Sequence, residues 1–240
     1  MYQRDYLVRL IQEMTAMIAR TLGLKEQKEK AELLLEWDDL LERKFRLNGK
    51  LTDTLSPDDI IKLFHRHGHL QSDELQALAI IMLERAELEY ELQQSSSSHD
   101  GLETADANHI QRLMKVYVLL VEAMLHGSNR SLLPVIEVVE KLSDKLAPYH
   151  LDASLLERIW RWHDLDQRYA EAENVLYEWM TGDEARLSLA AAWYERLLEL
   201  PDDELEAGGL PRDEVEQGLQ DVQTMMKVDR SNESEYADHT

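Results

Sequence analysis

Apolar residues recur every three or four positions along most of the chain, which is the spacing of one face of an α-helix. The pattern is densest over residues 152–201, where it predicts three helices in succession with very short connections. The middle one of these helices carries an apolar stripe formed by Tyr169, Ala172, Leu176 and Trp179. Helices joined by so few residues pack antiparallel. The pattern therefore predicts helical hairpins as the building unit.

About ten helices are predicted, and Gly, Pro and capping residues set their ends. Ser56-Pro57 predicts a helix start, because serine caps the first turn and proline fits its first position. That helix is expected to run to His67 and to stop at Gly68. Asn48-Gly49 is expected to end a helix, and the acidic stretch 202–210 is expected to be a loop.

Four consecutive serines interrupt the helical pattern. Residues 95–101 can bury nothing apolar, so they are expected to form a flexible loop or linker. The polar, charged end of the chain is expected to be disordered. The expected organisation is therefore helical hairpins over residues 1–94, a serine-rich loop over 95–101, helical hairpins over 102–227 and a disordered acidic tail over 228–240.

The fold class predicted from these patterns is all-α, since aromatics make up 7% of the chain and only 9 Gly and 5 Pro interrupt it. Tyr169, Ala172 and Leu176 match the second helix of a tetratricopeptide repeat, in which a small residue lets two helices approach closely. This match favours stacked antiparallel hairpins, a tetratricopeptide-like α-solenoid. An irregular helical bundle is the alternative, because no fixed period runs through the chain. Glu173, next to Ala172, is expected to face water.

Charge limits the partners that the chain can bind. The 26 basic and 48 acidic residues give a net charge of −22, and residues 151–240 alone hold 8 basic and 23 acidic residues, a net charge of −15. Such a field repels nucleic acid and anionic membranes. It is compatible with a protein or peptide partner, a basic one included, but solubility is the favoured explanation of the acidity. We expect a monomer or a weak homodimer.

The sequence also indicates the cellular compartment in which the protein is expected. There is no cysteine, so disulfides and thiolate chemistry are excluded and a reducing cytoplasm fits best. The first twenty residues lack the pattern of a secretory signal, and no apolar run approaches the length that spans a bilayer. We therefore expect a cytoplasmic protein.

Two stretches near the ends of the chain resemble a family of short, uncharacterised, all-α bacterial proteins that are loosely tetratricopeptide-like. The stretches are Asp5-Tyr6-Leu7-Val8-Arg9-Leu10-Ile11-Gln12 and Leu205-Glu206-Ala207-Gly208-Gly209-Leu210-Pro211-Arg212-Asp213-Glu214-Val215-Glu216. The resemblance implies a helical fold and a bacterial origin. It implies no activity, cofactor or functional residue.

His65, His67 and His69 are the candidate metal ligands, since three imidazoles lie within five residues. Residues two apart on a helix point about 200° away from each other, so His65 and His67 could not bind one ion on a helix. A structural or exposed role is therefore favoured. Acidic pairs such as Asp38-Asp39 could support hydrolysis, but most lie where carboxylates cap helices. Asp38 has no evident cationic partner at helical spacing.

Aromatic residues give the remaining candidate site. Trp160 and Trp162 lie two residues apart on a predicted helix, so they face different directions and one of them is expected at the surface or a groove. Together with Tyr169 they are the predicted partner-binding residues. The sequence thus favours a non-catalytic helical module for protein interaction or scaffolding, with no cofactor. The alternative is a metal-binding or hydrolytic helical protein that uses residues 65–69.

Overall fold

The computed structural model describes residues 2–21, 23–24, 26–95, 99–181 and 183–237, and side chains within 5–21, 23–24, 26–95, 106–181 and 183–227. The described residues form two compact units, residues 1–150 and residues 151–240. Among the described residues there are twelve helices and one pair of two-residue strands. The predicted all-α class is confirmed.

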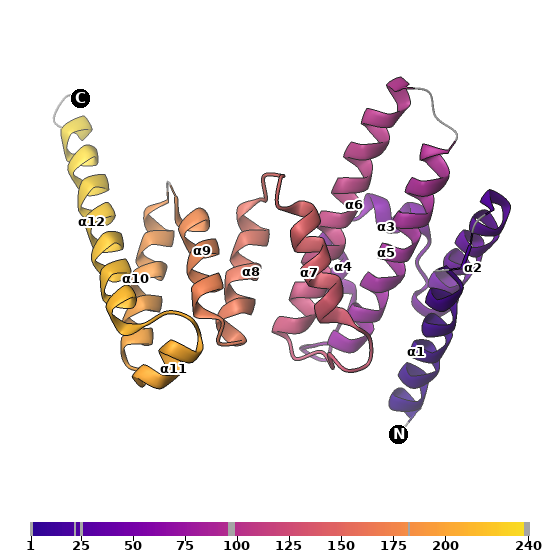
Figure 1. Ribbon diagram of the computed structural model, residues 1–240, viewed down its shortest axis with the longest axis horizontal. Coiled ribbons are helices and arrows are strands. Elements are labelled where there is room, and N and C mark those ends of the chain that lie inside the picture. Colours follow the sequence, from indigo (N-terminus) through magenta and orange to yellow (C-terminus); the bar gives the residue numbers. More distant parts are fainter. Residues whose placement is uncertain (1, 22, 25, 96–98, 182, 238–240) are drawn as a thin grey trace. The chain divides into compact units, whose positions relative to one another are not determined.

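The first unit holds seven helices and the strand pair. Its elements are α1 (Tyr2–Thr21), α2 (Gln27–Phe45), α3 (Gly49–Thr54), α4 (Pro57–Leu63), β1 (His65–Arg66), β2 (His69–Leu70), α5 (Ser72–Gln94), α6 (His99–Leu125) and α7 (Val135–Leu146). They are shown from indigo to rose in Figure 1.

Helix α5 is the centre of the first unit. It packs most extensively against α6 and also contacts α1 and α2, so it lies between these helices (Figure 1). Every residue from Glu74 to Met82 is buried, including the polar Glu74 and Gln76. A helical segment that is buried all round can exist only when neighbours cover every side.

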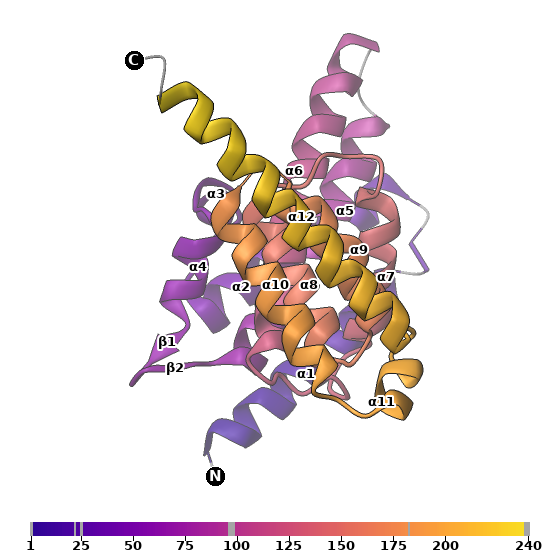
Figure 2. The ribbon, with the colours of Figure 1, turned by 90° about the vertical axis from the view of Figure 1, so that its left-hand side faces the viewer.

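The second unit is built from two helix pairs. Its elements are α8 (Ala153–Leu165), α9 (Tyr169–Met180), α10 (Glu184–Leu198), α11 (Asp202–Ala207) and α12 (Arg212–Ala237). Helix α8 packs against α9, and α10 packs against α12, which crosses in front of α10 in Figure 2. Ala172, Leu176, Tyr194 and Leu197 are fully buried in its core. The predicted stripe of α9 therefore faces this core.

Two of the twelve helices are short ones that the sequence pattern assigned to helix ends or loops. Asn48 was expected to end α2, but its side chain accepts a hydrogen bond from Leu51 N at 2.9 Å and begins α3. Residues 202–207 were expected in a loop and form α11. Asparagine and acidic residues are favourable at the starts of helices as well as in loops, so both predictions were wrong for the same reason.

The predicted division of the chain also needs correction. The boundary between units lies after His150 and not in the serine run, because α5 and α6 on either side of that run belong to one unit. Ser96, Ser97 and Ser98 lie outside the described residues, and α6 begins at His99, so the predicted loop is shorter. The expected tail is helical as far as Ala237, since 228–237 contain no glycine or proline to end α12. Residues 238–240 lie outside the described part.

Candidate functional site

A network of charged side chains joins α2, α3, α5 and α6 of the first unit. Arg85 on α5 is buried, with 7% of its side chain exposed. Its Nε donates to Asp38 Oδ1 of α2 at 2.6 Å, and its Nη2 donates to Glu89 Oε1 at 2.8 Å. A buried guanidinium needs such partners, because an unpaired charge in the interior is very unfavourable. Asp38 thus has a cationic partner 47 residues away in the chain.

Arg112 on α6 extends this network to α3. It donates to Glu89 Oε2 and, through Nη2, to Asp53 Oδ2 at 2.7 Å. One helical turn further on, Lys115 Nζ donates to the carbonyl oxygens of Thr52 and Asp53 at 2.8 and 2.7 Å. These carbonyl groups lie in the last turn of α3, where a cation also stabilises the negative end of the helix dipole.

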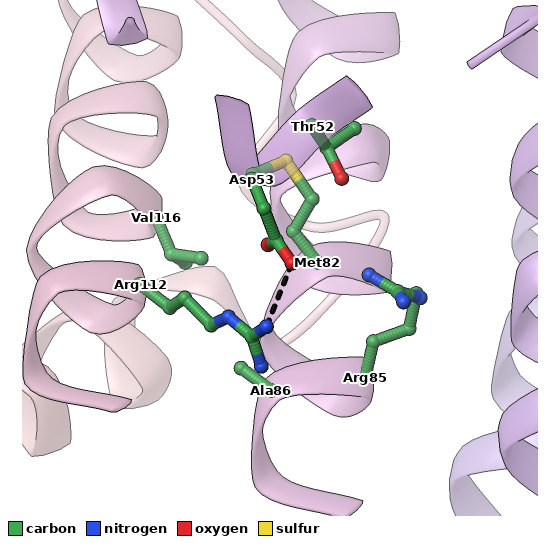
Figure 3. A pocket seen from close by; sticks show the side chains of 7 residues that line it. All are labelled: Thr52, Asp53, Met82, Arg85, Ala86, Arg112 and Val116. Carbon is green, nitrogen blue, oxygen red and sulfur yellow. Dashed lines mark hydrogen bonds and ion pairs between the residues drawn. The ribbon is translucent and has the colours of Figure 1, made fainter. Parts of the chain in front are cut away.

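Small spaces surround Arg112. A cavity of about 10 Å³, enough for one water molecule, lies among the seven side chains that Figure 3 shows, with Arg85 and Arg112 reaching it from different helices. A second space of about 30 Å³ touches Tyr90 and His109. A third of about 280 Å³ is lined by Asp53, Asn108, Gln111, Arg112 and Lys115.

Gly49 makes the network possible. A Cβ atom at this position would lie 2.0 Å from Arg85 Nη2, so a larger residue would displace the guanidinium or the start of α3. Sequence reasoning read Asn48-Gly49 as a helix end and missed this role. The glycine itself is visible in the sequence, but the reason for it is the close approach of Arg85, which lies 36 positions later in the chain.

The charges in this network balance. Asp38, Asp53 and Glu89 supply three negative charges, and Arg85, Arg112 and Lys115 supply three positive charges. Each guanidinium already holds two carboxylates, so neither is available as a free anion binder. These ion pairs link four helices, and removing one partner would leave another charge unpaired.

His65, His67 and His69 lie on a hairpin that projects from the first unit (Figure 2). The expected helix ends at Leu63, and β1 pairs with β2 so that His65 faces Leu70 and Arg66 faces His69. His67 and Gly68 have φ of 52° and 81°, as a tight two-residue hairpin turn requires. The glycine that was expected to stop a helix therefore forms a turn.

This hairpin does not bring the three imidazoles together. Paired residues share a face of a ribbon and successive residues alternate, so His69 lies on the face of Arg66, opposite to that of His65. All three histidines are exposed, and His65 Nδ1 lies 3.1 Å from Ile61 O. Across the side chains that the structure describes, no group of three His, Cys, Asp or Glu residues could hold a metal ion.

The aromatic candidates are buried in the second unit. Trp160, Trp162 and Tyr169 are 8%, 2% and 3% exposed, so the expectation that one tryptophan is at the surface was wrong. The two tryptophans do face different directions, but each has a partner. The Trp160 ring lies 5.6 Å from that of Trp179, and the Arg168 guanidinium covers the Trp162 ring at 4.4 Å. Tyr169 is part of the same core as Trp160.

An acidic segment, residues 202–216, lies on the second unit. It contains seven carboxylates and one basic residue, Arg212. Leu205, Leu210 and Val215 are buried and anchor the segment, while all seven carboxylates are exposed. Arg212 pairs with Asp202 and donates to the carbonyl oxygens of Leu198 and Leu200. None of the other six carboxylates has an ion-pair partner among the described side chains: Asp203, Glu204, Glu206, Asp213, Glu214 and Glu216.

Comparison with known protein families shows which family the chain matches. The model of DUF6483, a family of unknown function, matches residues 1–227 and thus extends over both units. No curated protein and no solved structure matches the chain. In the described part of the chain, no helix is both long and apolar enough to cross a membrane.

Proposed function

The chain belongs to the DUF6483 family, and we propose that it is a non-catalytic binding module that recognises a basic segment of another protein through residues 202–216. The observation that supports this proposal is a set of six exposed carboxylates, on a segment held by buried apolar residues, that have no ion-pair partner among the side chains that the structure describes. Fixed charges of one sign attract and orient an oppositely charged partner, and they speed its association.

Helix capping explains only part of this acidity. Asp202, Asp203, Glu204, Asp213 and Glu214 lie in first turns of helices, where carboxylates stabilise the positive end of the dipole. Glu206 and Glu216 lie beyond those turns. Glu206 is near the end of α11, where a negative charge is unfavourable for the helix itself. Capping therefore does not account for the whole segment.

The buried aromatic residues have a supporting role in this proposal. Trp160 and Tyr169 hold α8 and α9 together, and Ala172 lets the helices approach as in a tetratricopeptide-like hairpin. We accordingly propose stacked hairpins as the scaffold that presents the acidic segment. A cytoplasmic location and a monomeric state are parts of the same proposal, since the chain has no cysteine and like charges repel a second copy.

The test measures binding of a labelled lysine-rich peptide to the full chain by fluorescence anisotropy. Glu204, Glu206, Glu214 and Glu216 are changed together to Gln, which keeps the side-chain size and removes four charges. Each exposed charge pair contributes about 0.2–1 kcal/mol, so we expect the variant to bind about tenfold more weakly or worse. The difference should shrink as salt is added.

The control variant removes four exposed carboxylates from the first unit, by changing Glu26, Glu29, Glu32 and Glu42 to Gln. Its net charge equals that of the test variant. We expect the control to retain most of the affinity of the parent chain. Equal weakening in both variants would show that only the overall charge matters, and the proposal would then be abandoned.

A further inference from the structure

The turn between α8 and α9 folds an arginine back onto the end of α8. Gln167 has a φ of 58°, and Arg168 N donates to His163 O at 2.9 Å. The guanidinium carbon of Arg168 then lies 4.4 Å from the centre of the Trp162 ring, and the His163 ring lies 4.7 Å from the same ring. Stacking on an aromatic face fixes the plane of a guanidinium.

Four nitrogen atoms of this cluster have no acceptor. Trp162 Nε1, His163 Nδ1, Arg168 Nε and Arg168 Nη2 are all buried and lack a hydrogen-bond partner among the described residues. Arg168 also forms no ion pair within that part of the chain. Buried polar groups are almost always hydrogen-bonded, so four unpaired nitrogens on three neighbouring residues call for an occupant.

The chemistry of these atoms restricts what the occupant can be. An indole N–H and a guanidinium can only donate, and His163 Nδ1 donates in one tautomer. Nε–H and Nη2–H are adjacent, parallel donors of a guanidinium, and this edge fits two oxygen atoms of one carboxylate or phosphate group. The indole and the guanidinium thus offer donors and a positive charge and no acceptor. A cation or an apolar group would leave these donors unsatisfied.

We propose that Arg168, Trp162 and His163 form a binding site for an oxyanion, a phosphate or a carboxylate group. The two oxygens of the anion accept from Arg168 Nε and Nη2, and Trp162 Nε1 supplies a third donor. The stacked ring holds the guanidinium in place before the anion arrives, which reduces the entropy lost on binding. This site uses none of the carboxylates of residues 202–216, so it is independent of the function proposed above.

His163 adds a second property to the site. Burial, and then the charge of Arg168, lowers the pKa of His163 to about 4, although the carboxylates of Glu171 and Asp166 oppose this shift. The imidazole is therefore neutral near pH 7. A bound anion would offset the charge of Arg168 and favour the protonated imidazole. Anion binding is therefore expected to raise this pKa, and to strengthen as the pH falls.

The test follows the side-chain N–H signals of Arg168 and Trp162 by heteronuclear NMR in the full chain. Inorganic phosphate is titrated at constant ionic strength, and acetate is titrated in a parallel sample. We expect both signals to move together and to saturate at concentrations up to about 10 mM with at least one of the two anions. The anion that saturates at the lower concentration identifies the preferred class.

Three variants check the assignment. Arg168→Gln should abolish the movement of the Trp162 signal, and Arg168→Lys should weaken binding about tenfold, since lysine keeps the charge but loses the paired donors. Arg161→Gln is the matched control, because Arg161 lies on α8 and its guanidinium also covers a tryptophan ring, that of Trp160, at 5.6 Å. It should bind like the parent chain.

Two results would overturn the inference. In the first, neither anion moves either signal in a chain whose spectrum is otherwise native, which would mean that only water satisfies the donors. In the second, Arg168→Gln and Arg168→Lys respond to the anion as the parent chain does. Failure of the lysine-rich peptide to bind residues 202–216 would leave this inference unaffected.

Discussion

A hydrogen bond inside the second unit gives Glu173, the neighbour of Ala172 on α9, a structural role. Tyr194 is fully buried, and its hydroxyl donates to Glu173 Oε1 at 2.7 Å. Burial raises the pKa of Glu173 above its usual range, although the bond from Tyr194 opposes this shift. The sequence-based expectation that Glu173 faces water was wrong, because its partner lies on another helix.

Ala172 and Glu173 should therefore both be sensitive to substitution. Ala172 is fully buried, and Ala172→Leu inserts three carbon atoms into a packed core at a cost of about 1–3 kcal/mol. Glu173→Ala leaves the buried Tyr194 hydroxyl without an acceptor and costs about 1–3 kcal/mol. Chemical denaturation measures both changes.

Glu178→Ala provides the control, since Glu178 is exposed on the same helix. Its free energy of unfolding should change by no more than about 0.5 kcal/mol. If all three variants were equally stable, neither the close packing at Ala172 nor the hydrogen bond at Glu173 would be significant.

At the scale of elements, His109 joins three helices of the first unit. Its ring stacks on Tyr90 of α5 at 4.1 Å, and its Nε2 lies 3.2 Å from Lys145 Nζ of α7. An ammonium group can only donate, so Nε2 accepts and the ring proton lies on Nδ1. Glu87 completes the group, with an oxygen 3.0 Å from Lys145 Nζ.

The stability of the first unit should fall as the pH drops through the range in which free histidine titrates. Burial lowers the pKa of His109, and Lys145 and Arg112 lower it further, while Glu87 opposes them. The unfolded chain therefore binds the proton first. Stability is present in full above about pH 6.5 and is lost toward the lower pKa of the folded state, by at most about 1.4 kcal/mol per pH unit.

His109→Gln removes this contribution, and urea denaturation between about pH 7 and pH 5 measures it. The variant should show a smaller loss of stability with falling pH than the parent chain. His163, whose pKa is lowered as well, titrates in both proteins and so cancels in the comparison. Equal slopes would contradict the interpretation of His109.

The sequence identified elements well where their signals are local. Ser56 caps α4 through its own side chain, as the sequence pattern indicated. Residues 65–68 were predicted wrongly as a helix end, because glycine ends helices and forms hairpin turns alike. The network around Arg85 was missed for a different reason. Arg85 meets Asp38, and Arg112 meets Asp53, only through the packing of α2, α3, α5 and α6.

At the scale of the whole molecule, an exposed segment connects the two units. Residues 147–152 link α7 to α8, and all of them except the half-buried Leu151 are exposed. Brief digestion with a protease should cut here and produce two helical fragments. Mass spectrometry of the fragments locates the cut. Early cleavage only within 95–101 would instead favour the division that the serine run suggested.

The units also differ in charge. Residues 1–150 hold 18 basic and 25 acidic residues, a net charge of −7, whereas residues 151–240 have a net charge of −15. Two copies that approach through their second units therefore repel each other strongly at low salt. Any weak homodimer would be expected to form through the first unit.

The burial of residues 74–82 of α5 on every side has a consequence for how the protein is made. Its residues 74–82 are synthesised before α6, the helix that covers them most extensively, is available. During this interval an apolar segment has no partner on one side, which is the condition under which nascent chains aggregate. The helix at the centre of the finished unit thus needs protection while translation continues.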